Sequence, residues 1–281
     1  MLKTRIILFI SAAVLVAIIF TLPKVVVDNE ENAVPNKTTS GTSHAEPTPT
    51  EIDTDNIAHG QAVPADIQKK IDNLKIDYSN SSNIEKSVIF ADSLAELYLS
   101  INKYDSAAKF VEIIAENIPN EKNWERAGNT YYDAFGFAMD PQKRAYLGEK
   151  AREYFLKVME KTPSNLDVKN KLAMTYLSTS NPMKGIGMLR EIIEQDPKNE
   201  KAMFNLGVLS MQSNQYNKAV EHFSKLVKTY PNNTQAQFFL GVSYLETGNK
   251  DKAKEQFELV KTLDDDPEVQ ATADSYLEDI R

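Results

Sequence analysis

The chain has 281 residues, no cysteine and a formal net charge of −8. The absence of cysteine excludes disulfides, thiol chemistry and cysteine-ligated zinc, and the acidic balance argues against binding to nucleic acid or to anionic lipid head groups. The hydrophobic fraction of 42% is enough for a continuous helical core.

The N-terminus combines a short basic flank with an apolar run. Lys3 and Arg5 precede residues 6–22, of which only two are polar. A helix of this length reaches about 26 Å, the short limit of a membrane span, and no small-x-small cleavage site follows it. We therefore expect a transmembrane signal-anchor, with a cleaved signal peptide as the competing interpretation. The basic flank predicts that residues 1–5 stay in the cytoplasm while the residues after Lys24 are translocated.

Residues 28–63 have the composition of a tether. They contain no aromatic residue, three prolines and many Thr, Ser, Asn and Glu. Such a segment cannot bury enough apolar surface to order itself. We expect a disordered linker with a root-mean-square reach of roughly 30 Å.

A helical stripe follows the tether. Its apolar members recur at three- and four-residue spacing, and they are Ile67, Ile71, Leu74 and Tyr78. We expect residues 64–87 to form an N-terminal helical cap.

The C-terminal half repeats itself with a period of 34 residues. The three segments that superimpose without a gap are 166–199, 200–233 and 234–267. In the last of them, Leu240 and Tyr244 lie one turn apart on a first helix, and Gly241 lets a second helix approach closely. Ala253 and Phe257 then present a small and a large residue to the crossing point. Such a period indicates stacked helix hairpins, none of which buries its apolar face alone.

This arrangement resembles the tetratricopeptide repeat (TPR) family, whose pattern is W-x2-L-G-x2-Y…A-x3-F…P. The resemblance implies an all-α, right-handed helical solenoid, and it implies a protein that binds peptides on a concave face.

The pattern continues upstream of the three regular segments. Residues 121–165 match it with Trp124, Gly128 and Phe155, and they carry 11 extra residues in the middle of the hairpin. About three helical turns are thereby added, and we expect both helices of this hairpin to be longer. One more unit, 88–120, gives about five repeats over 88–267.

A last helix is expected at residues 268–281. Its apolar stripe consists of Val269, Ala273, Tyr276 and Ile280. We interpret this segment as a C-terminal capping helix.

Nothing in the sequence favours catalysis. His44 and His59 fall in the tether, and His222 lies beside Phe223 on a second helix. No phosphate-binding loop, HExxH or Gly-x-Ser-x-Gly motif occurs. The acidic run at 264–266 is typical of a helix N-terminus rather than of a metal site. We expect neither an enzyme nor a bound cofactor or metal.

The concave positions of the first helices predict an apolar groove. Its candidate protein-binding residues are Met174, Leu177, Phe204, Val208, Met211, Phe238, Val242 and Leu245. Such a groove suits an amphipathic helix or an unfolded segment. The alternative is that neighbouring first helices bury these side chains.

Aromatic residues around the tip of the long hairpin form a second candidate surface. They are Tyr132, Phe135, Phe137 and Tyr146. Aromatic residues are enriched at interfaces. In the alternative they pack on the first repeat, whose first helix is expected over about 84–101.

These observations predict a membrane-anchored interaction module or scaffold of the bacterial cell envelope. Its N-terminal helix lies in the inner membrane, its C-terminal domain lies in the periplasm, and its partner is a protein or peptide rather than nucleic acid. Two alternatives remain open: an assembly factor for an envelope complex, and a self-associating homo-oligomer organiser.

Overall fold

The computed structural model describes residues 63–280, which contain twelve helices and no strand. None of these helices is both long and apolar enough to cross a membrane. The predicted anchor at 6–22 lies outside the described residues, and the predicted linker 28–63 reaches them only at its last residue. The helices are α2 (Ala65–Asn80), α3 (Ile84–Ser100), α4 (Tyr104–Asn117), α5 (Glu121–Phe137), α6 (Pro141–Lys161), α7 (Leu166–Tyr176), α8 (Pro182–Gln195), α9 (Glu200–Gln212), α10 (Tyr216–Thr229), α11 (Thr234–Glu246), α12 (Lys250–Leu263) and α13 (Pro267–Ile280).

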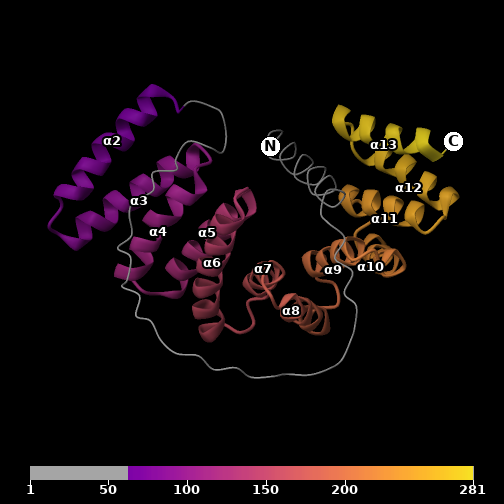
Figure 1. The fold of residues 1–281 in the computed structure, drawn as a ribbon, viewed down its shortest axis with the longest axis horizontal. Helices are drawn as coiled ribbons and strands as arrows, with labels where there is room; N and C mark the ends of the chain where they lie inside the picture. Colours follow the sequence, from indigo (N-terminus) through magenta and orange to yellow (C-terminus); the bar gives the residue numbers. More distant parts are fainter. Residues whose placement is uncertain (1–62, 281) are drawn as a thin grey trace, which may run out of the picture. The chain divides into compact units, whose positions relative to one another are not determined.

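The helices pair in chain order into five hairpins that stack into a solenoid (Figure 1). We call α3, α5, α7, α9 and α11 the first helices, and α4, α6, α8, α10 and α12 the second helices. Figure 1 shows the described helices along an arc, with α7 on its inner side and α8 on its outer side. Two further helices, α2 and α13, pack against the first and last hairpins.

Each first helix begins at an asparagine. Its side-chain oxygen accepts a hydrogen bond from a backbone N–H in the first turn, which would otherwise be unpaired. These N-cap residues are Asn83, Asn120, Asn165, Asn199 and Asn233. The last three are spaced by the 34-residue period, so the repeat specifies where each first helix starts.

Three hairpin turns use a left-handed residue. Asn102, Asn214 and Gly248 have φ values of 59°, 56° and 78°, a conformation that asparagine and glycine adopt more readily than other residues. The residue after each one donates its backbone N–H back to the first helix. These turns reverse the chain tightly enough for the two helices to pack.

Glycine on the first helix sets how closely a hairpin closes. A Cβ added to Gly207 would lie 2.6 Å from the ring of Phe223, and one added to Gly241 would lie 2.9 Å from the ring of Phe257. The prediction that Gly241 permits a close helix approach is therefore confirmed. The phenylalanine ring occupies the space that a larger residue would need.

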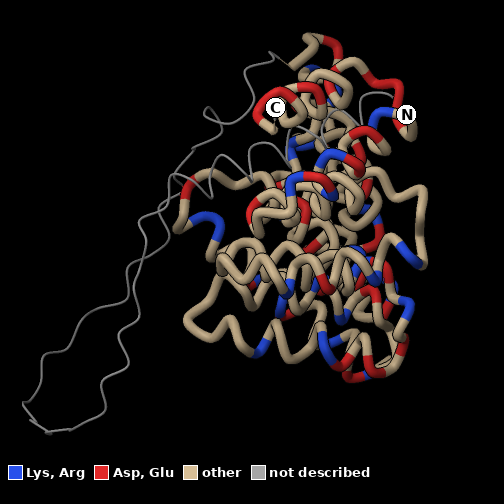
Figure 2. The backbone as a smooth tube through the Cα atoms, turned by 90° about the vertical axis from the view of Figure 1, so that its right-hand side faces the viewer, with Lys and Arg blue, Asp and Glu red and all other residues tan. Residues whose placement is uncertain are grey.

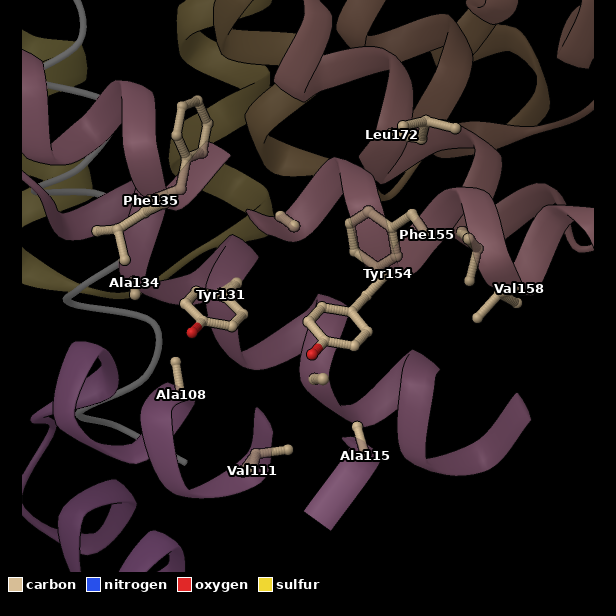
Figure 3. Close-up of a cluster of buried hydrophobic side chains, with 14 of the residues drawn as sticks. Ala108, Val111, Ala115, Tyr131, Ala134, Phe135, Tyr154, Phe155, Val158 and Leu172 are labelled. Atoms are coloured by element: carbon tan, nitrogen blue, oxygen red, sulfur yellow. The ribbon is translucent and has the colours of Figure 1, made fainter. Parts of the chain in front are cut away.

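The long hairpin also forms as predicted. Helices α5 and α6 have 17 and 21 residues, against 13 and 14 in α11 and α12, so both helices take up the insertion. The core of this region is drawn in Figure 3, and Val111 of α4, Tyr131 of α5 and Phe155 of α6 all belong to it. All three side chains are buried.

The two end helices bury the stripes expected of caps. Ile71 of α2 is buried among residues of α3 and α4, and Val269 and Ala273 of α13 are buried. Tyr276 of α13 stacks on Phe257, with 4.9 Å between ring centroids.

We predict that Gly207→Ala lowers the free energy of unfolding by roughly 1–3 kcal/mol, because the new methyl group meets the ring of Phe223. Urea unfolding of the full-length protein, followed by circular dichroism, measures the change. Gly136→Ala is the matched control: a Cβ there meets nothing within 4 Å, so stability should hold or rise by up to about 1 kcal/mol. Equal stability of the two variants would contradict the glycine–phenylalanine contact.

Candidate functional site

The candidate site is the face that the first helices present along the inner side of the arc, which we call the first-helix face. The structure does not expose the eight predicted groove residues evenly. Met211 and Val242 are buried, with 7% and 8% of their surface accessible. Met174, Leu177, Phe204, Val208, Phe238 and Leu245 are half-buried. Met211 and Val242 are therefore not available to a ligand in this conformation.

Phe204 and Phe238 join adjacent hairpins rather than projecting from them. The ring of Phe204 lies 5.8 Å from that of Phe223 and 5.6 Å from that of Phe239. The ring of Phe238 contacts Phe257 at 5.6 Å and Tyr276 at 5.4 Å. Edge-to-face contacts at these distances stabilise an aromatic core. Val208 and Leu245 take part in no such cluster, and they are the apolar side chains best placed to meet a partner.

The N-terminal half of the first-helix face is polar and internally paired. Arg126 of α5 reaches back to α3, where its two terminal nitrogens donate to Asp92 at 2.5 Å and to Glu96 at 2.7 Å. Lys171 of α7 donates to Asn129 of α5 at 2.7 Å.

The pairing continues into α9. Lys201 pairs with Asp167 of α7, and Asn205 donates to Asn170 at 3.1 Å. Burial alone would raise the pKa of Asp167, but the hydrogen bond from Lys201 and the charge of Lys171 outweigh it and hold that pKa below its usual value. These charged residues are therefore partners of one another.

Sequence reasoning missed Arg126, Asn129 and Lys171. A signal was present, because Arg126 and Asp92 are 34 residues apart, as are Lys201 and Asp167. Oppositely charged residues one period apart occupy the same position on adjacent first helices and therefore meet. Figure 2 shows acidic and basic residues interspersed over the described helices.

The second candidate surface is mostly packed. Phe135 is buried. The centroid of the Tyr132 ring lies 6.1 Å from that of Phe135 and 6.2 Å from that of Phe155. Phe137 stacks on Tyr104 of the first repeat at 4.9 Å. Phe137 and Tyr146 nevertheless have 39% and 51% of their surface accessible. The four residues thus do not form one continuous exposed patch, and the packed alternative describes Phe135 and Phe137.

The long hairpin encloses a cluster of titratable groups around Glu112 of α4. Its carboxylate accepts hydrogen bonds from the Tyr131 hydroxyl at 2.6 Å, from Lys150 at 2.8 Å and from the Tyr154 hydroxyl at 3.2 Å. Both tyrosine hydroxyls point toward α4 in Figure 3. Tyr131 and Tyr154 are buried, so a substrate has no access to the hydroxyls in this conformation and the cluster is structural. Within residues 63–280, no group of His, Asp and Glu is arranged to hold a metal ion.

The electrostatics of this cluster follow from burial and hydrogen bonding. Burial alone would raise the pKa of Glu112, but the hydrogen bonds from Lys150 and Tyr131 outweigh it and lower that pKa. Burial and the Glu112 carboxylate together raise the pKa of Tyr131 far above its usual value. The cluster is therefore most stable with Glu112 charged and Tyr131 neutral.

Comparison with known proteins finds one family. The model described as "Tetratricopeptide repeat" matches residues 210–273. A structure titled "Crystal structure of MamA protein" is similar at 18% identity and a TM-score of 0.48, over 63% of this chain and 91% of that one. "MamA 41-end from Desulfovibrio magneticus RS-1" is similar at 16% identity and 0.49, over 63% and 94%. "Crystal structure of YrrB: a TPR protein with an unusual peptide-binding site" is similar at 20% and 0.45, over 74% and 97%. A search of curated proteins found no match. We infer nothing about the partner of this chain from these likenesses.

We predict that acid destabilises the protein through Glu112. Its folded-state pKa lies below the reference value of 4.5, so its stabilisation is present above pH 4.5 and is lost as pH falls through the folded pKa. Glu112→Gln should lower the unfolding free energy at pH 7 by roughly 1–3 kcal/mol and should flatten its decline below pH 4.5. Urea titrations at several pH values measure both effects. Glu116→Gln, one turn along α4 and exposed, is the control. An unchanged acid slope in Glu112→Gln would contradict the assignment.

Proposed function

We propose that the whole protein is an anchored interaction module that binds a polypeptide segment along its first-helix face. The match of residues 210–273 to the tetratricopeptide repeat model supports this proposal. The observation that carries this proposal is the division of that face. Its charged pairs lie toward the N-terminal end and join α3 to α5 and α7 to α9, whereas its half-buried apolar side chains begin with Met174 and Leu177 of the third hairpin and continue along α9 and α11.

The division indicates the chemistry of the partner. An amphipathic helix or an extended segment can set its apolar residues against Val208 and Leu245 and turn its polar residues toward the paired half. Apolar contact gains free energy in proportion to the area removed from water. A polyanion such as nucleic acid would find no concentrated positive charge on this face, because Arg126, Lys171 and Lys201 are already paired with carboxylates.

We also propose that the solenoid works outside the cytoplasm, held by residues 6–22 in a bacterial inner membrane. Support comes from the basic flank and the apolar run of the sequence. The linker 28–63 then lets the solenoid sample a volume next to the membrane, with a reach of roughly 30 Å.

We predict that Val208→Glu reduces capture of the partner on the order of tenfold or more, because a charge in an apolar contact is costly to desolvate. The full-length protein is isolated from gently solubilised membranes with its bound partner, and the partner is quantified by mass spectrometry. Phe204 and Phe238 are unsuited to this test, since their rings belong to the core.

Leu259→Glu is the matched control for this experiment. Leu259 is exposed on the second helix α12, so the same charge added there should leave capture intact. Thermal melts of both variants establish that they fold. Undiminished capture by a folded Val208→Glu variant would exclude this face as the binding site. Recovery of an envelope complex would identify the assembly role. Recovery of only the protein itself would identify the homo-oligomer role.

We predict that protease added to spheroplasts digests the solenoid while a cytoplasmic marker survives, because Lys3 and Arg5 hold the N-terminus inside. An antibody to the C-terminus reports the digestion. Protection of the C-terminus together with the marker would reverse the orientation. A mature N-terminus near residue 24 would show a cleaved signal peptide instead of an anchor.

A further inference from the structure

The third hairpin, α7 and α8, closes differently from its neighbours. Helix α7 has 11 residues, whereas α9 and α11 have 13 each. Ser180 stands where one period later Asn214, and two periods later Gly248, adopt a left-handed φ. Serine adopts that conformation less readily, and the described segment 177–181 contains no residue with positive φ.

The backbone–backbone hydrogen bond that closes the other turns is replaced in the α7–α8 turn by a longer hydrogen bond to a side-chain hydroxyl. Gln215 and Asn249 donate their backbone N–H to the carbonyls of Ser210 and Tyr244, each at 2.8 Å. At the corresponding place, Asn181 donates to the Thr179 hydroxyl at 3.2 Å. The α7–α8 connection is therefore held by fewer backbone bonds.

Helix α8 also carries two glycines of different kinds. Gly185 is required by packing, since a Cβ there would collide with the backbone carbonyl of Ala173. Gly187 has no such reason: a Cβ there meets nothing within 4 Å. Glycine in a helix interior weakens the helix relative to alanine because it loses more backbone entropy on folding. Gly187 thus adds local freedom without any gain in packing.

The junction between α8 and α9 is the least extensive of the described junctions between a second helix and the next first helix. Its buried side chains are Leu189 and Ile192 of α8 against Ala202 and Leu206 of α9. On the inner side of the arc, α7 and α9 are joined by the pairs Lys201–Asp167 and Asn205–Asn170. Polar pairs therefore join α7 to α9 on the inner side of the arc, at the place where the contact between α8 and α9 on the outer side is least extensive.

We propose that the α7–α8 hairpin is a hinge between two stiffer halves, α2–α6 and α9–α13. The α7–α9 polar pairs act as the pivot, and α8 moves against α9 on the outer side. The hinge lies where the first-helix face changes from paired charges to apolar side chains. Its motion sets the angle between these two parts of the face, and this property of the fold does not depend on the identity of any partner.

The experiment measures distances across the hinge in the full-length protein. Because the chain has no cysteine, spin labels can be attached at Glu160→Cys of α6 and Lys228→Cys of α10, which span the hinge. Lys228→Cys with Lys254→Cys of α12 is the control pair within one half. All three positions are exposed. We expect a broader distance distribution for the spanning pair than for the control pair.

Hydrogen exchange and a matched glycine pair complete the test. We expect amides of α8 to exchange faster than those of α10, and Gly187→Ala to slow them roughly two- to fivefold while it narrows the spanning distribution. Gly136 is the other described helical glycine with free space for a Cβ. Gly136→Ala should leave unchanged both the exchange rate of the α8 amides and the width of the spanning distance distribution. Equally narrow distributions for the two label pairs would overturn the hinge. Fast exchange in α8 with a narrow spanning distribution would also overturn it, since that result describes local fraying.

Discussion

In three of the five hairpins, a phenylalanine ring of the second helix fills the space left by a glycine on the paired first helix. The pairs are Gly128 with Phe155, Gly207 with Phe223 and Gly241 with Phe257. Each contact fixes the distance and angle at which one hairpin closes. Because the ring of Phe223 also stacks on Phe239 of α11, and the ring of Phe257 stacks on Tyr276 of α13, the same residues join each hairpin to the element that follows it. Stacking, curvature and the exposure of the first-helix face follow from this contact.

The third hairpin shows what happens when the contact is absent. Ala173 stands in place of the glycine, Leu189 in place of the phenylalanine, and Gly185 of α8 takes over the close approach. The close contact thus moves to the carbonyl of Ala173, and no aromatic ring extends toward the next hairpin. The junction of this hairpin with α9 is also the least extensive of its kind among the described helices. In the hinge proposed above, this local exchange of residue sizes is what loosens the stack.

Much of the fold could be predicted from the sequence, because the residues that recur with its period determine structure within a single hairpin. Gly241 and Phe257 predicted where two helices cross closely, and the 11-residue insertion predicted the long hairpin. The asparagine N-caps were overlooked although Asn165, Asn199 and Asn233 are one period apart. Exposure on the first-helix face could not be predicted in the same way. The burial of Met211 and Val242 depends on the angle between neighbouring hairpins, and that angle is a property of the stack rather than of one repeat.

The paired charges of the first-helix face contribute little to stability, since exposed ion pairs are worth about 0–1 kcal/mol each. Their larger effect is on what can bind. A partner that covers Arg126 must desolvate a guanidinium already bonded to Asp92 and Glu96, and it recovers that cost only if it leaves those bonds intact. The paired half therefore disfavours ligands that compete for its charges and tolerates those that lie over them with polar groups. In the binding mode proposed above, affinity comes from the apolar half at α9 and α11, while the paired half selects orientation.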